Sequence, residues 1–174
     1  MQQTEPMNKP ANTVRSAQEL YAHAIAMERE AAACYCELAG QMSKLGHRDV
    51  AAVFARLAAI EAKHLRTLER RTDGVAIPAL PPEQLHWLEG GAPETPTREF
   101  LQRALTPQAA LGVALAAEKR AQAFFEHVYR TAQDPALHGL AQEMAMEEKA
   151  HVALVERLLA EADRPAGARA ARDL

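Results

Sequence analysis

Residues 60–64 read Ile-Glu-Ala-Lys-His, and residues 147–151 read Glu-Glu-Lys-Ala-His. Each stretch places a glutamate three residues before a histidine, so the two side chains lie one turn apart on one face of an α-helix. That face is otherwise apolar: around the first stretch, positions 50, 54, 57 and 68 are Val, Phe, Leu and Leu. The pattern predicts two helices that each point a glutamate and a histidine into a protein core.

Two further glutamates interrupt apolar stripes earlier in each half of the chain. Residues 24–28 read Ala-Ile-Ala-Met-Glu, and residues 114–118 read Ala-Leu-Ala-Ala-Glu. These segments align with each other when the two halves are superimposed, as do the two Glu-x-x-His stretches. We infer an internal duplication in which each half supplies one lone glutamate and one Glu-x-x-His pair.

The first two helices are marked by their boundary residues. Ser16 to Glu19 form a capping box, in which each end satisfies a free backbone N–H, and the helix that begins there should run to about residue 44. A second helix is expected over about 47–71, because Gly46 breaks the pattern before it and Gly74 follows it. A short connection of this kind predicts an antiparallel hairpin.

The last two helices begin at Thr-Pro and Asp-Pro pairs, where a capping residue precedes a proline in the first turn. They are expected over about 106–131 and 134–162. The connection at 75–105 is rich in proline and contains a Gly-Gly pair, so only short helices are expected there, at 82–88 and 97–105.

Two hairpins joined by a long crossover predict an all-α, ferritin-like four-helix bundle, in which the second and third helices are parallel. An alanine-rich composition with few aromatic residues agrees with close-packed helices. The predicted domain covers residues 16–163. Segments 1–15 and 164–174 are expected to be disordered or flexible.

Four carboxylates in one core would repel one another, and each buried ion costs several kcal/mol unless a counter-charge compensates it. Two divalent cations balance four carboxylates, with neutral imidazoles as the remaining ligands. One Glu from each of two helices and Glu-x-x-His from the other two is the ligand pattern of di-iron and di-manganese bundles. The predicted ligands are Glu28, Glu61, His64, Glu118, Glu148 and His151.

Several of these residues also have other interpretations. Glu83 and His86 form a third Glu-x-x-His, which we treat as coincidence because it lies in the crossover without an apolar helical face. Solvent-facing charge is the default for any ligand taken alone. Tyr35 is either a hydrogen-bond donor to a ligand or an ordinary core residue. Glu147 should turn away from the centre, but could accept a histidine N–H.

The charge pattern and the composition exclude several classes of function. The net charge is −3 and charges of both signs are interspersed, so nucleic acid is not an expected partner. The N-terminus is polar and no apolar run reaches about eighteen residues, so a cytoplasmic protein outside the membrane is expected. Cys34 and Cys36 point in different directions on a helix and are interpreted as idle or buried thiols in a reducing compartment.

The segment from Met27 to Tyr35, the two Glu-x-x-His pairs and the residues around Glu118 resemble the rubrerythrin branch of the ferritin-like superfamily. The likeness covers about residues 16–162. It implies a non-haem di-iron site, with the six residues above as iron ligands and the Glu-x-x-His glutamates as bridges. It also implies oxidation by hydrogen peroxide or dioxygen, with peroxide reduction the usual rubrerythrin activity.

Three departures from the family shape the expectation. The chain has no pair of Cys-x-x-Cys motifs for a rubredoxin module, so electrons are expected from an unknown donor protein or from Fe(II). Ala121 replaces an extra rubrerythrin glutamate, which brings the ligand set closer to bacterioferritin. Ala62 stands where bacterioferritin has its haem-ligating methionine, so no haem is implied. The long crossover favours a homodimer over a closed shell.

The sequence thus predicts a di-iron oxidoreductase that reduces hydrogen peroxide or dioxygen. The alternatives are a ferroxidase or iron-handling protein, and a purely structural bundle without metal. Two Fe ions are the expected cofactors, with manganese or zinc as alternative occupants.

Overall fold

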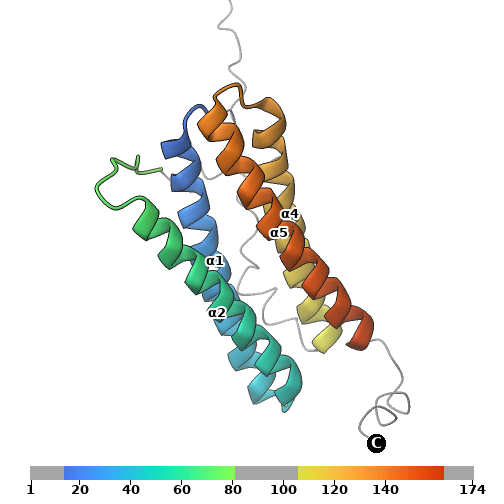
Figure 1. The fold of residues 1–174 in the computed structure, drawn as a ribbon. Coiled ribbons are helices and arrows are strands. Elements are labelled where there is room, and N and C mark those ends of the chain that lie inside the picture. The colour runs from blue at the N-terminus through green and yellow to red at the C-terminus, as the bar shows by residue number, and fades with distance from the viewer. Residues whose placement is uncertain (1–13, 81–105, 163–174) are drawn as a thin grey trace, which may run out of the picture.

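The computed structural model describes residues 14–80 and 106–162 and contains four α-helices in this part of the chain (Figure 1). They are α1 (Ala17–Lys44), α2 (Arg48–Arg71), α4 (Pro107–Thr131) and α5 (Pro135–Ala162). The helix boundaries agree with the predicted ones to within a residue. The predicted short helices, the tail and the Glu83–His86 motif lie outside the described residues.

Side-chain caps explain where three helices begin. The Thr106 hydroxyl accepts a hydrogen bond from the N–H of Ala109 at 3.2 Å, and Asp134 Oδ1 accepts one from the N–H of Leu137 at 2.8 Å. In both cases the helix then opens with a proline, whose missing N–H leaves no unpaired donor. The predicted Thr-Pro and Asp-Pro starts are therefore confirmed.

The capping box at the start of α1 differs from the prediction in one bond. Ser16 Oγ accepts from the N–H of Glu19 at 3.1 Å, as expected. The Glu19 carboxylate, however, accepts from the N–H of Arg15 at 2.7 Å, one residue before the cap. Val14 also packs against the core, so ordered contacts begin just before the helix.

Left-handed glycines shape the ends of the first hairpin. Gly46 has a φ of 85° between α1 and α2, and Gly74 has a φ of 74° after α2. A side chain at either position would be strained, because residues with a Cβ rarely adopt this conformation. The two glycines therefore allow the chain to reverse after α1 and to leave α2 sharply.

The chain forms an all-α four-helix bundle built from two hairpins, as predicted. Helix α2 packs along α1 and α5 packs along α4, while the hairpins meet mainly through α1. The colours of Figure 1 show that α2 and α4 run in the same direction, which is the predicted parallel relation. Among the helices of the described residues, none is both long and apolar enough to span a membrane.

Buried apolar side chains form two clusters, one at each end of the bundle. The first lies where α1 and α5 begin and where α2 and α4 end. Its buried members are Leu20, Ala24, Met27, Leu68, Phe124, Phe125, Val128, Leu137, Leu140, Ala141 and Met144. The second lies at the opposite end and contains Tyr35, Leu38, Met42, Phe54, Leu57, Ala110, Leu111, Ala114 and Val155. On every helix, the predicted ligands fall between the two clusters.

Candidate metal centre

The structure brings all six predicted ligands into one layer in the middle of the bundle. Glu28 comes from α1 and Glu118 from α4, while α2 and α5 each contribute a Glu-x-x-His pair. The four glutamates and His151 are all buried, with at most 6% of any of them exposed. We call Glu28, Glu61 and His64 the first half-site, and the corresponding Glu118, Glu148 and His151 the second half-site.

His151 lies close to three carboxylates in the second half-site. Its Nδ1 atom lies 3.4 Å from Glu118 Oε2, 3.6 Å from Glu148 Oε2 and 3.4 Å from Glu61 Oε1. Two ligand atoms that each lie about 2.1 Å from one metal ion are about 3.0 to 3.4 Å apart, depending on the coordination angle. These separations therefore suit a shared cation.

The first half-site has the same donors in a looser arrangement. His64 Nδ1 lies 3.7 Å from Glu28 Oε1 and 3.8 Å from Glu61 Oε2. The rings of His64 and His151 stack, with centroids 5.1 Å apart and planes at 11°. The His64 side chain is 22% exposed, against 8% for His151, so this histidine forms the wetter edge of the centre.

Glu61 connects the two half-sites. Its Oε1 atom faces His151 of α5, while its Oε2 atom faces His64 of α2. Ligand atoms of Glu61, His64 and His151 lie within 4.8 Å of one another, as do those of Glu118, Glu148 and His151. The two groups of donors could each hold a metal ion, and Glu61 is placed to contact both.

Burial dominates the electrostatics of the carboxyl groups. It raises the pKa of Glu28 to about 8, although the interaction with Glu61 lowers that pKa, and it raises the pKa of Glu61 to about 9, where Glu28 and Glu118 act in the same direction. Burial likewise raises the pKa of Glu148 to about 8, assisted by Glu118 and Glu61. Without a cation, these groups therefore keep protons at neutral pH.

The pKa of His151 is raised by its neighbours, against the effect of its burial. Burial by itself would lower its pKa, but the facing carboxylates Glu118, Glu148 and Glu61 together raise it to about 11. The metal-free second half-site is thus balanced by an imidazolium ion. A cation that displaced this proton would meet the same ring of carboxylates that now holds it.

Several buried polar atoms of the centre have no hydrogen-bond partner within the described residues. They are Glu28 Oε2, Glu61 Oε1, His64 Nδ1 and His151 Nδ1. Buried polar groups without partners are costly, and most of those in native proteins have one. All four atoms are typical metal donors, so the residues present fit a bound cation.

Tyr35 is both a core residue and a hydrogen-bond donor to a predicted ligand, the two roles that the sequence left open. It is 1% exposed and packs in the second apolar cluster, and its hydroxyl donates a hydrogen bond to Glu118 Oε1. The sequence placed Tyr35 two turns beyond Glu28 on α1, but its partner belongs to the other hairpin. Phe125, its counterpart in the second half of the chain, is buried and has no hydroxyl.

Glu147 lies at the rim of the centre. It is partly buried, and its charge raises the pKa of both Glu28 and Arg71. Within the described residues it accepts no hydrogen bond from His64 or His151, so the alternative role as a histidine partner is not realised. Arg71 instead forms an ion pair with Glu143 at 2.6 Å, which joins α2 to α5.

Comparison with known proteins gives one informative likeness. A solved structure of an uncharacterized conserved protein from Magnetospirillum magnetotacticum MS-1 is 30% identical in sequence and superposes with a TM-score of 0.72. The match covers 87% of this chain and 98% of that chain. No family model and no curated protein matches the sequence.

Proposed function

Because this chain belongs to the same family as that uncharacterized protein, we propose its function from the centre itself: a di-iron oxidoreductase that reduces hydrogen peroxide or dioxygen. The observation that carries the proposal is the set of four buried carboxylates and two histidines from four helices, with donor atoms left without hydrogen bonds. This is the donor set of di-iron bundles. The resemblance of the sequence to rubrerythrins supports hydrogen peroxide or dioxygen as the oxidant.

Each half-site would hold one ion. Glu28, Glu61 and His64 form the first set of donors, and Glu118, Glu148 and His151 the second. Glu61 would be shared, because its two oxygens face different histidines, and Glu148 is its counterpart in the repeat. When bound, two Fe(II) ions supply the two electrons for the reaction H₂O₂ + 2H⁺ + 2e⁻ → 2H₂O.

The protein's own contribution is to position the donors and to exclude water. Tyr35 holds one oxygen of Glu118, which leaves Oε2 of that carboxylate facing His151. The two apolar clusters enclose the centre on both sides along the bundle axis, which strengthens the electrostatic interactions within it. The carboxyl and imidazole protons held in the metal-free protein leave as a cation binds.

The decisive experiment is an anaerobic Fe(II) titration of the metal-free protein, comparing wild type with Glu61→Ala. We expect two tightly bound ions per wild-type chain and fewer than two in the variant, because Glu61 contacts both half-sites. Glu83→Ala serves as the matched control and should bind as wild type. No tight binding by the wild type would refute the metal centre and leave the purely structural bundle.

A ferroxidase remains the second candidate, because the same donors would serve it. The two functions are separated by the preferred oxidant and by the fate of iron. Faster oxidation by peroxide, with both ions retained, supports the oxidoreductase. Faster oxidation by dioxygen, with Fe(III) released and further Fe(II) consumed, supports the ferroxidase.

A further inference from the structure

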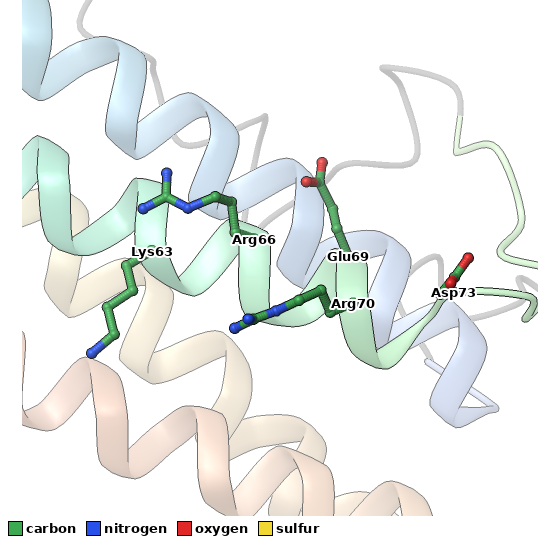
Figure 2. A pocket seen from close by; sticks show the side chains of 5 residues that line it. All are labelled: Lys63, Arg66, Glu69, Arg70 and Asp73. Carbon is green, nitrogen blue, oxygen red and sulfur yellow. The ribbon is translucent and has the colours of Figure 1, made fainter.

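Three cationic side chains lie together on the outer surface of α2. Lys63, Arg66 and Arg70 are all exposed, and their spacing of three and four residues places them along one side of the helix. Together with Glu69 and Asp73 they line a hollow, and in Figure 2 the charged ends of Lys63 and Arg70 point to the same side of α2, whereas that of Arg66 points away from them. We call these five residues the α2 hollow.

The cations of the α2 hollow are weakly compensated within the described residues. Lys63 and Arg66 form no ion pair there, and Arg70 donates only to the hydroxyl of Thr67, at 3.2 Å. The carboxylate of Glu69 is turned to Arg29 of α1, at 3.3 Å. Like charges three and four residues apart destabilise a helix, so an external negative partner would relieve this arrangement.

The hollow and the metal centre draw residues from the same stretch of α2. Lys63 directly precedes His64, and the His64 side chain is the more exposed of the two histidines. A molecule seated on Lys63 would therefore lie close to one proposed ligand. Electron transfer becomes rapidly slower with distance, so this is a favourable side from which to deliver electrons.

We propose that the α2 hollow docks an acidic protein that carries one electron at a time. The proposal rests on the proposed function, since the two electrons consumed with each peroxide have to be returned by a donor. Two successive dockings of the reduced carrier would return them, each leaving one oxidised carrier behind. Opposite charges on the two surfaces would speed the encounter and orient the partner.

The lining of the hollow favours a protein over other anions. Its volume of about 400 Å³ would accept a small molecule, and the aliphatic stems of its residues form most of its wall, but no buried or aromatic side chain among the described residues lines it, unlike a typical small-molecule pocket. Nucleic acid would require a uniformly basic stripe. Here Glu69 and Asp73 interrupt the cations, as in the mixed charge pattern of a protein interface.

The test measures docking on the metal-free protein by isothermal titration calorimetry. The probe is an acidic plant-type [2Fe–2S] ferredoxin, titrated into wild type, Arg66→Glu/Arg70→Glu and the control Arg48→Glu/Arg56→Glu. Both double variants change the charge of α2 equally, and the control residues are exposed at its other end. We expect affinity to fall about tenfold in the first variant, to change less than about twofold in the control, and to decrease with salt.

Three results would overturn the proposal: no binding to the wild type, equal losses in both variants, or displacement of ferredoxin from the hollow by inorganic phosphate or short duplex DNA at matched ionic strength. An Fe(II) titration of the same variants separates this inference from the proposed function. Two bound ions with no docking would refute the docking surface alone. Absence of bound iron would refute the proposed function, whatever the docking result.

Discussion

The two half-sites contain the same three residue types, yet their surroundings differ. His151 is almost fully buried and lies 3.4 to 3.6 Å from three carboxylates, whereas His64 is partly exposed and lies 3.7 to 3.8 Å from two. Tyr35 donates a hydrogen bond to Glu118 in the second half-site. Its repeat counterpart is Phe125, which offers Glu28 no such bond. The two half-sites therefore share their residue types, but packing gives these residues different exposure and different hydrogen bonds.

The metal-free half-sites also balance their charges differently. In the first, protons remain on Glu28 and Glu61, because burial raises the pKa of both carboxyl groups. In the second, burial likewise keeps a proton on Glu148, and His151 carries a further proton because the carboxylates around it raise its pKa. The comparison teaches that one core can tolerate buried carboxylates either by neutralising them or by pairing them.

The largest expected effect concerns the stability of the metal-free protein as pH changes. Folded Glu28 and Glu61 keep protons that the unfolded chain releases near pH 4.5, so stability is complete below pH 4.5 and is lost as pH rises through 8 to 9. The raised pKa of His151 acts in the same direction between pH 6.5 and 11. Thermal unfolding should show a loss of several kcal/mol, at about 1.4 kcal/mol per proton and pH unit.

A matched variant shows which half-site causes the pH dependence. Glu28→Gln keeps the shape of the side chain but removes its ionisation, so the stability loss between pH 5 and 8 should become smaller. Glu69→Gln, on the exposed surface of α2, is the control and should leave the slope unchanged. A stability that rises over this pH range in the metal-free wild type would contradict the buried, protonated carboxyls.

The next effect compares the two histidines directly. His151→Ala should weaken the tighter Fe(II) site by more than about a hundredfold, because His151 faces three carboxylates in a dry environment. His64→Ala should cost about tenfold, since water can reach the partly exposed position and replace the imidazole. Anaerobic titration measures both affinities. Equal losses would show that exposure does not distinguish the half-sites.

A smaller effect on Fe(II) binding is expected from Tyr35, which bonds to the second half-site and has no equivalent at the first. Tyr35→Phe removes the bond to Glu118 and should weaken Fe(II) binding about tenfold, with a stability loss of about 1 to 3 kcal/mol from the buried carboxyl oxygen left unpaired. Calorimetry of the metal-free and loaded protein measures both. Phe125→Tyr is the complementary variant, because it adds the hydroxyl group that Phe125 lacks and that could donate to Glu28. If Tyr35→Phe changes only stability, Tyr35 is a packing residue.

The smallest effect tests the connection between the hairpins. Arg71→Gln breaks the ion pair that joins α2 to α5 at 2.6 Å, while Lys119→Gln breaks the 2.8 Å pair of Lys119 and Glu156 within the second hairpin. All four side chains are about half exposed, so each loss should be at most about 1 kcal/mol. Urea unfolding measures both variants. A much larger loss for Arg71→Gln would reveal a structural role that its exposure does not suggest.

Local sequence signals were enough for the helices and for predicting that six polar side chains meet in the core. Thr106-Pro107 and Asp134-Pro135 mark helix starts through short-range hydrogen bonds, and one-turn spacing puts Glu61 with His64 on one face. These signals involve residues that are close to one another in the sequence, so they can be recognised without knowing how the helices pack. The predicted reciprocal bond of the capping box was wrong, because the Glu19 carboxylate accepts from the N–H of Arg15 and not from that of Ser16.

Contacts between the hairpins could not be obtained in the same way. Spacing placed Tyr35 near Glu28, but its hydroxyl bonds Glu118, which is 83 residues away. The different exposure of His64 and His151 likewise depends on how the hairpins meet, and the repeat predicts them to be equal. The pairing of Arg71 with Glu143 had no sequence signal. The cations of the α2 hollow were not singled out from the sequence, because their common exposure on α2 depends on how the helices pack.

The division of the core into two apolar clusters decides which routes lead to the centre. Large side chains close the bundle along its axis at both ends, with Phe124 and Phe125 on one side and Tyr35 and Phe54 on the other. A reactant of the proposed centre would therefore have to reach it from the side, between helices, and His64, the more exposed of the two histidines, marks the side on which the centre is nearest to solvent.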